Sequence, residues 1–222
     1  MKTSWDYVGR LCAIVDVEVA ERAAWSPTDL TTAYLKGGAR FLQLRAKSLS
    51  GSQFLDLASN ICDLAHSAGA GVIINDRADV ARLSGADGVH VGQDDLPPLA
   101  VRTIVGTESM IGLSTHTEPQ IESAIQQPID YIAIGPVFGT STKATGYAAV
   151  GLERVRYVSA QMWRRPLGLR TGDLGVVAIG GITLDCAADV INAGATAVAV
   201  ITDLIATGDP EARVRAYLAR LR

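Results

Sequence analysis

The feature that most constrains the fold is a regular alternation of short apolar runs with segments of helical length. Eight such runs lie at residues 11–15, 40–45, 71–75, 88–91, 110–114, 131–135, 176–180 and 197–201. Strands that alternate with helices form β-α-β units around a parallel sheet. Most of the runs are continuously apolar, which is typical of strands covered on both faces. The pattern therefore predicts an α/β protein with a parallel sheet.

Segments between the runs carry helix signals. Residues 26–38 have Pro27 near the first helical position and end in glycines, and residues 52–70 and 183–195 repeat apolar residues at helical spacing. Eight β-α units in 222 residues predict a single (β/α)8 TIM barrel over residues 1–222, slightly below the length of about 250 residues that is usual for this fold. A doubly wound open sheet is the alternative. The proline, glycines and clustered arginines of residues 161–175 predict a surface loop.

The composition excludes several classes of protein. Hydrophobic residues make up 48% and charged residues 19% of the chain, which indicates a folded globular protein. A net charge of −3 argues against nucleic acid as a partner, and the apolar runs are too short to cross a membrane. The N-terminus does not resemble a signal peptide, and three scattered cysteines without zinc spacing suit a reducing compartment. We therefore expect a cytoplasmic protein.

Polar residues cluster at the ends of the predicted second, third and fourth strands, where barrel enzymes place their active sites. Gln43, Arg45 and Lys47 alternate with apolar residues, so they share one face of the strand. Asp76 and Asp95 follow the next two strands, and their carboxylates suit Mg²⁺, which takes one or two carboxylates plus phosphate oxygens. We expect a phosphate-rich ligand here. The alternative is that these aspartates cap the following helices or pair with Arg77.

Two anion sites are predicted from the strand ends. The first uses Arg45, Lys47 and a metal, joined by Lys143 of the stretch GTSTK at 139–143. The second uses the hydroxyls of that stretch and the loops after the seventh and eighth strands, where AIGGIT at 178–183 lies and where barrels often bind phosphate.

Among the histidines, we expect His66 to be structural and His90 to pack in or near the barrel. His116 shares a strand face with Ser114, but the spacing does not establish a Ser-His-Asp arrangement.

Taken together, these motifs resemble the thiamine-phosphate synthase family. QLRAK, INDRADVARLSGADGVHVGQDDL, GLSTHT, IAIGPVFGTSTK and VVAIGGIT match its signatures in order over nearly the whole chain. The resemblance implies a (β/α)8 barrel and a Mg²⁺-dependent transferase. That enzyme joins 4-amino-5-hydroxymethyl-2-methylpyrimidine diphosphate to 4-methyl-5-(2-phosphoethyl)thiazole, giving thiamine phosphate and pyrophosphate by a dissociative substitution. The resemblance also suggests a homodimer.

The resemblance further implies a role for individual residues. Gln43 would contact the pyrimidine, and Ser114 would lie beside the pyrimidine and the reacting carbon. The diphosphate would be held by Arg45, Lys47, Asn75 and Lys143. The metal ligands would be Asp76 and Asp95. The thiazole phosphate would be bound by Thr140, Thr142, Gly181, Ile201 and Thr202. The residues expected to take part in catalysis are Arg45, Lys47, Ser114 and Lys143.

The chain also departs from the family pattern. Thr202 stands where serine is usual, Ala144 replaces a second lysine, and Asp203 lies where a small residue is common. A carboxylate near a bound phosphate is unfavourable unless it points away. Two alternative functions are a thiazole tautomerase-like paralogue and a non-catalytic barrel that binds thiazole or thiamine phosphate. A tautomerase needs no diphosphate site, so the cations and aspartates predicted for that site argue against it.

Overall fold

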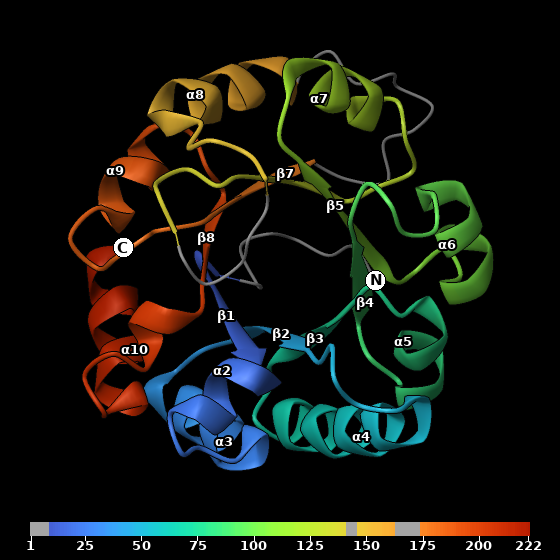
Figure 1. The fold of residues 1–222 in the computed structure, drawn as a ribbon, viewed down its shortest axis with the longest axis vertical. Coiled ribbons are helices and arrows are strands. Elements are labelled where there is room, and N and C mark those ends of the chain that lie inside the picture. The colour runs from blue at the N-terminus through green and yellow to red at the C-terminus, as the bar shows by residue number, and fades with distance from the viewer. Residues whose placement is uncertain (1–8, 141–145, 163–173) are drawn as a thin grey trace.

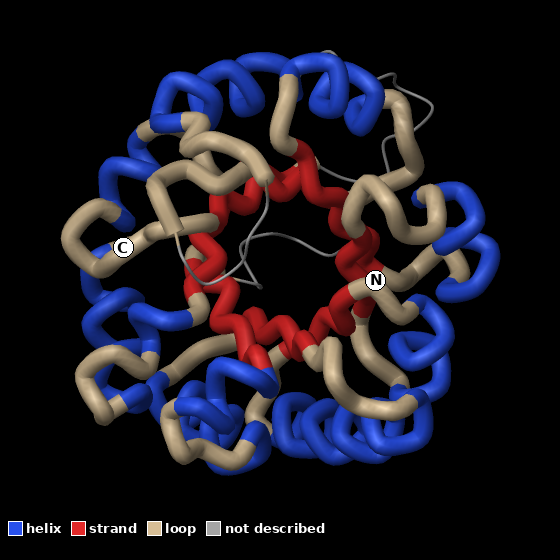
Figure 2. Tube along the Cα trace, in the orientation of Figure 1, coloured by secondary structure: helices blue, strands red, loops and turns tan. Residues whose placement is uncertain are grey.

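Eight parallel strands form a closed barrel in sequence order. The computed structural model describes residues 9–140, 146–162 and 174–222, so the predicted site residues Thr142 and Lys143 lie outside the described residues, as do Ala144 and most of the predicted 161–175 loop. The strands are β1 (Leu11–Asp16), β2 (Phe41–Arg45), β3 (Gly71–Asn75), β4 (Gly88–Val91), β5 (Met110–Thr115), β6 (Tyr131–Ile134), β7 (Gly175–Ile179) and β8 (Ala197–Val200). Figure 2 shows these strands as an inner ring surrounded by helices.

The barrel closes because β1 pairs with both β2 and β8. In the register of these pairs, Asp16 lies opposite Arg45 and Ala13 lies opposite Val200. The predicted (β/α)8 barrel is therefore confirmed, and the open doubly wound sheet is wrong. The apolar runs match the observed strands to within one residue at each end.

Helices cover the outside of the barrel (Figure 1). They are α2 (Val17–Arg22), α3 (Pro27–Gly37), α4 (Gly51–Ser67), α5 (Ala78–Ser84), α6 (Pro98–Val105), α7 (Glu118–Ile125), α8 (Gly151–Gln161), α9 (Ala187–Asn192) and α10 (Pro210–Arg220), with a 3-10 turn η3 (Thr202–Leu204) after β8. Local signals fix their starts. Ser26 caps α3 just before Pro27, and Ser50 forms a reciprocal capping box with Gln53 at the start of α4. Among the described residues, no helix is long and apolar enough to cross a membrane.

The helix predicted at 183–195 is shorter than expected. Residues 184–186 form a turn in which the carbonyl of Thr183 accepts hydrogen bonds from the amides of Cys186 and Ala187, and α9 begins only at Ala187. The turn therefore prolongs the loop that follows β7 at the mouth of the barrel.

Side chains alternate between two cores. Leu42 and Leu44 of β2 belong to the outer core between strands and helices, whereas Phe41 faces the barrel interior. The inner core is formed by Cys12, Ile14, Phe41, Ile73, Met110, Tyr131, Ala133, Val177, Ala197 and Ala199. By the same alternation Gln43 and Arg45 follow Phe41 on the inward face. This inner core thus fills the barrel below the polar strand ends.

Candidate active site

A cavity of about 700 Å³ opens at the carboxyl ends of the strands. Its volume is within the usual range for a small-molecule site. The predicted site residues that the structure describes all line it: Gln43, Arg45, Lys47, Asn75, Asp76, Asp95, Ser114, Thr140, Gly181, Ile201 and Thr202. The structure therefore brings together residues that are spread over 160 positions of the sequence, from Gln43 to Thr202.

The Arg45 guanidinium is held by the end of the neighbouring strand. Its Nη1 donates to Oδ2 of Asp16 at 2.6 Å and lies 3.6 Å from Oε2 of Glu18. Asp16 is only 3% exposed and also caps α2 by accepting from the amide of Val19. The barrel register sets this contact because Asp16 is the strand partner of Arg45. Sequence reasoning missed both acids, although the sequence DVE directly after the first apolar run was a visible signal.

Glu18 holds the chain segment that carries Lys47. Its Oε1 accepts from the amide of Lys47 at 2.7 Å and from the amide and hydroxyl of Ser48 at 2.9 Å each. Burial alone raises the pKa of Glu18, but these hydrogen bonds outweigh it and lower the pKa to about 2. Glu18 is therefore a carboxylate at neutral pH, and it fixes the backbone at Lys47.

Two carboxylates meet beside Lys47. Asp76 has a φ of 65°, a conformation that L-residues other than asparagine and aspartate seldom adopt, and its carboxylate forms a short ion pair with the Lys47 ammonium. Asp95 accepts from the amide of Gly92 at 2.7 Å. Burial first, and then the adjacent Asp76 carboxylate, raises the pKa of Asp95. Two neighbouring carboxylates that resist joint ionisation favour a bound cation.

The capping alternative for these aspartates is wrong. The N-cap of α5 is Arg77, and that of α6 is Pro97. Arg77 donates to Asp79, its neighbour on α5, at 2.8 Å. Within the part of the chain that the structure describes, no group of three or more His, Cys, Asp or Glu side chains is placed to hold a metal ion. A cation at Asp76 and Asp95 therefore needs further oxygens from a ligand or from water, which is the usual coordination of Mg²⁺.

A polar network lies under Ser114. His90 Nε2 is 2.8 Å from Ser114 Oγ, and His90 Nδ1 is 3.0 Å from the hydroxyl of Tyr131, on which the imidazole also stacks. Tyr131 is further hydrogen-bonded to Gln43, and burial raises its pKa. His90 lies inside the barrel as expected, but sequence reasoning missed its polar contacts. The histidine links Ser114 to a phenol rather than to an aspartate, so the network is not a hydrolase triad.

The remaining histidines have separate surroundings. His116 stacks on Tyr147 with ring centroids 4.1 Å apart, and its Nδ1 lies 2.5 Å from the carbonyl oxygen of Gly135. His66 lies in α4 with Nε2 3.0 Å from Asp87, a contact far from the cavity that agrees with the predicted structural role. The side chain of Gln93 donates to the carbonyl of Ser114 at 2.6 Å and steadies the end of β5.

The loops after β7 and β8 form the opposite side of the cavity. Gly181 has a φ of 64°, and a Cβ there would lie 2.5 Å from the carbonyl oxygen of Gly139. Only glycine therefore allows the loop after β7 to lie against the segment that carries Thr140. Ile201 and Thr202 begin the short turn η3 on the adjacent strand end. Gly181, Ile201 and Thr202 thus line the cavity together on this side.

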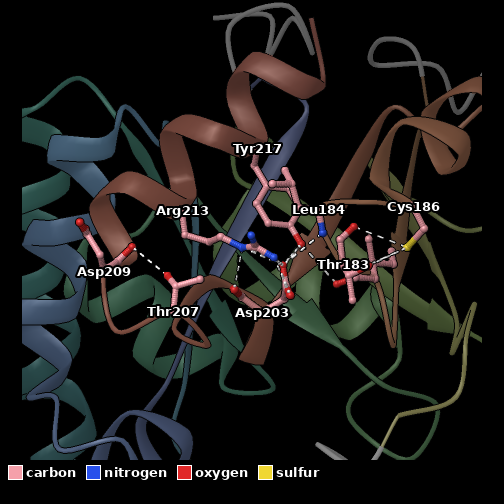
Figure 3. Close-up of polar contacts among 9 residues, drawn as sticks. Thr183, Leu184, Cys186, Asp203, Thr207, Asp209, Arg213 and Tyr217 are labelled. Atoms are coloured by element: carbon pink, nitrogen blue, oxygen red, sulfur yellow. Dashed lines mark hydrogen bonds and ion pairs between the residues drawn. The ribbon is translucent and has the colours of Figure 1, made fainter.

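The carboxylate of Asp203 is engaged by α10. It accepts hydrogen bonds from Arg213 and Tyr217 and from the amide of Leu184 (Figure 3). The charge that looked unfavourable in the sequence is therefore offset by the Arg213 guanidinium.

Comparison with known proteins agrees with this geometry. The family model described as thiamine monophosphate synthase matches residues 11–204. A thiamine-phosphate synthase of Roseiflexus sp. (strain RS-1) is 42% identical over 192 residues, covering 86% of this chain and 77% of the relative. One of Chlorobium luteolum is 39% identical over 209 residues, covering 94% and 91%.

Solved structures give the same result. A thiamine phosphate pyrophosphorylase from Pyrococcus furiosus superposes with a TM-score of 0.83 at 25% identity, covering 98% of this chain and 96% of the other. An N-(5'-phosphoribosyl)anthranilate isomerase from the same organism, at 12% identity and a TM-score of 0.64 with 96% and 98% covered, shares the fold alone. The family match, the identities and the barrel together show that this chain belongs to the thiamine monophosphate synthase family.

Proposed function

We propose that the mouth of this barrel is the active site of a transferase that joins the pyrimidine diphosphate to the thiazole phosphate, yielding thiamine phosphate and pyrophosphate. The observation that carries the proposal is one cavity lined by every described residue predicted for this reaction. The relatives named thiamine-phosphate synthase favour this reaction over the tautomerase-like and the non-catalytic alternatives.

The side of the cavity at β2, β3 and β4 would receive the diphosphate. Arg45 and Lys47 bring positive charge to it, Asn75 at the end of β3 offers an amide, and Lys143 belongs to this group by the sequence motif. Before a ligand arrives, Asp16 orients the Arg45 guanidinium and Glu18 fixes the backbone at Lys47. Preorganised charges of this kind act most strongly where negative charge develops, which here is the departing pyrophosphate.

Asp76 and Asp95 fit a resident Mg²⁺. Their carboxylates adjoin, and burial together with the neighbouring Asp76 carboxylate raises the pKa of Asp95. When bound, the ion supplies further positive charge beside the diphosphate oxygens. Oxygens of the substrate and of water would complete its coordination.

The reaction needs no strong base. The bond between the exocyclic carbon of the pyrimidine and the diphosphate oxygen breaks, and its electron pair leaves with pyrophosphate. The thiazole nitrogen then forms the new C–N bond with its lone pair, so no proton must be removed. The protein must therefore hold two substrates in contact, and Gln43 and Ser114, both fixed by the Tyr131–His90 network, would hold the pyrimidine.

The thiazole phosphate would lie on the opposite side of the cavity. The hydroxyl of Thr140 and the backbone of Gly181, Ile201 and Thr202 line it there, with Thr142 added by the sequence motif. The partners in this proposal are thus two small molecules. The homodimer and the cytoplasmic location stay predictions of the sequence.

The test supplies both substrates with and without Mg²⁺ and follows thiamine phosphate by its fluorescence after oxidation, together with pyrophosphate release. We expect both products only when the metal is present. Ligand binding without pyrophosphate release would instead identify a non-catalytic sensor. Full activity after the metal is removed with a chelator would contradict the assigned role of the aspartate pair.

The Asp76→Asn variant tests the metal site directly. Loss of one carboxylate removes half of the predicted protein ligands, so we expect turnover to fall at least about tenfold and the Mg²⁺ concentration for half-maximal rate to rise. Asp79→Asn, which alters the carboxylate that pairs with Arg77 on α5, is the matched control and should keep the wild-type Mg²⁺ dependence. Equal behaviour of the two variants would show that Asp76 is not a ligand.

A further inference from the structure

A cluster of charged and polar side chains joins two loops of the cavity to the last helix. Asp203 lies in η3, directly after Thr202, and faces Arg213 and Tyr217 of α10 (Figure 3). We propose that Asp203, Arg213 and Tyr217 form a positioning clamp that sets the separation of the two backbone segments expected to bind the thiazole phosphate. This inference rests on the proposed function and assigns these residues a role through the two segments that they hold.

The clamp is built on a bidentate ion pair. Arg213 Nη2 donates to both oxygens of Asp203, at 3.0 Å to Oδ1 and 2.8 Å to Oδ2, and Arg213 Nε donates to Oδ2 at 3.1 Å. The Tyr217 hydroxyl donates to the same Oδ2 at 2.5 Å. Charge-assisted and forked hydrogen bonds are among the strongest and most directional in proteins, so they fix the carboxylate in place and in orientation.

The clamp reaches the segment after β8 through its own backbone. Arg213 Nε lies 3.2 Å from the carbonyl oxygen of Asp203, so it holds the main chain as well as the side chain. Thr202 is the preceding residue, and its amide follows Ile201 at the cavity. The turn η3 has only three residues, so few local hydrogen bonds define it. Arg213 therefore adds a contact from α10 to the two backbone hydrogen bonds of the turn itself.

The clamp reaches the segment after β7 through two further contacts. Oδ2 of Asp203 accepts from the amide of Leu184 at 3.2 Å, and the Tyr217 hydroxyl lies 3.4 Å from the carbonyl oxygen of Ile182. Ile182 follows Gly181 directly in the sequence. The Asp203 carboxylate thus contacts both segments, which belong to different strands, and the Tyr217 hydroxyl, whose proton goes mainly to Asp203, lies against the carbonyl of Ile182.

The surroundings of the clamp keep it in one state. The side chains of Asp203 and Arg213 are only 15% and 21% exposed, and Tyr217 is fully buried. Burial first, and then the Asp203 carboxylate, raises the pKa of Tyr217, so the phenol stays a donor. Arg213 offsets the charge of Asp203, so that the clamp adds no net negative charge beside a bound phosphate.

Binding groups that belong to the main chain change position only when the main chain itself moves. Small displacements of binding groups have large effects on substrate positioning. The clamp variants should therefore weaken the handling of one substrate, the thiazole phosphate. The pyrimidine diphosphate is expected on the far side of the cavity, against Arg45 and Lys47, and its binding should be unaffected.

The experiment measures the KM for each substrate separately in Asp203→Asn and Tyr217→Phe, with the thermal midpoint as a record of folding. In Asp203→Asn one oxygen becomes an amide that cannot accept from Arg213, so we expect the KM for the thiazole phosphate to rise about tenfold or more. The KM for the pyrimidine diphosphate should stay within about twofold. Tyr217→Phe should show the same selectivity with a smaller rise.

Asp209→Asn is the matched control. Asp209 caps the same helix by accepting from the amide of Ala212 at 2.9 Å, and it lies apart from the clamp (Figure 3). This variant loses a carboxylate and some stability on α10, so it shows what a purely structural defect does. We expect both of its KM values to match those of the wild type.

Two outcomes would overturn the clamp: a wild-type KM for the thiazole phosphate in both clamp variants, or an equal rise of both KM values in the clamp variants and in Asp209→Asn. If Asp203→Asn does not fold, Tyr217→Phe decides. Failure of the proposed function is distinct, because the wild type would then make no thiamine phosphate. In that case calorimetric binding of the thiazole phosphate to wild type and Tyr217→Phe decides: equal Kd values overturn the clamp, and selective weakening supports it.

Discussion

The two sides of the cavity handle negative charge in different ways. The side-chain edge, defined by Arg45, Lys47, Asp76 and Asp95 at β2 to β4, consists of long ionisable groups that are already paired with one another or with acids of β1 and α2. The backbone edge, defined by Gly181, Ile201 and Thr202 at β7 and β8, consists of peptide groups held by the clamp. One edge is organised by local charge and the other by a helix outside the barrel.

The contrast indicates which kinetic property a substitution at each edge should change. At the side-chain edge Asp16 holds Arg45 and Asp76 pairs with Lys47, so a ligand there meets cations that acids already hold in place. A ligand at the backbone edge meets peptide groups whose geometry is set in advance, so its binding depends on chain position. Substitutions at the first edge should alter chemistry, and those at the second should alter affinity.

The largest effect is expected from Lys47→Ala. The ammonium is a preorganised charge at the proposed position of the leaving pyrophosphate, so we expect kcat to fall about a hundredfold, while the KM for the thiazole phosphate stays near the wild-type value. Steady-state kinetics with each substrate varied in turn measures this. Lys36→Ala, at the end of α3 and away from the cavity, is the control. A kcat close to wild type would show that Lys47 does not stabilise the departing pyrophosphate.

A smaller effect, on KM rather than on kcat, is expected from Gly181→Ala. The added Cβ would lie 2.5 Å from the carbonyl oxygen of Gly139, and the φ of 64° disfavours any L-residue with a side chain. The loop must shift, so we expect the KM for the thiazole phosphate to rise about tenfold with little change in kcat. Gly106→Ala also replaces a glycine of positive φ, but in open space after α6, and should keep both constants. A selective loss of kcat in Gly181→Ala would erase the contrast between the edges.

The smallest effect concerns stability in acid and tests whether local charge organises the side-chain edge. The folded-state pKa of Glu18 is lowered from 4.5 to about 2, so its contribution to stability is fully present above about pH 4.5 and is lost as the pH falls toward 2. This contribution is at most about 3 kcal/mol. Glu18→Gln should therefore be less stable at pH 7, with a flatter dependence between pH 4.5 and 2.

Denaturant unfolding at a series of pH values measures that dependence. Glu21→Gln, which alters an exposed acid of the same helix, is the control and should follow the wild-type curve. Parallel curves for Glu18→Gln and the wild type would show that the hydrogen bonds from Lys47 and Ser48 do not stabilise the fold.

The barrel could be predicted from the sequence because most strands are short apolar runs buried on both faces, so their alternation with helical segments located them. The strand-end residues could be predicted for the same reason, since parallel strands bring their carboxyl ends together. Asp16 and Glu18 were missed because their contact with Arg45 and Lys47 depends on the register of β1 against β2. The roles predicted for Thr142 and Lys143 stay predictions.

Other parts of the site depend on contacts that no local pattern encodes. His90 and Tyr131 are 41 positions apart and meet only because both side chains face the barrel interior. Asp203 looked unfavourable in the sequence because its partners, Arg213 and Tyr217, lie one helix further along the chain. A charged residue can be judged only when its neighbours in space are known.

The inner core under the cavity limits the route by which substrates reach the active site and products leave it. Side chains such as Phe41, Met110 and Val177 fill the barrel below the cavity, so these described residues leave no passage through the barrel interior. Both reactants and both products then use the mouth at the carboxyl ends of the strands, where the cavity opens. Because the two reactants are expected on opposite sides of this mouth, release of the products from it must precede the next round of binding.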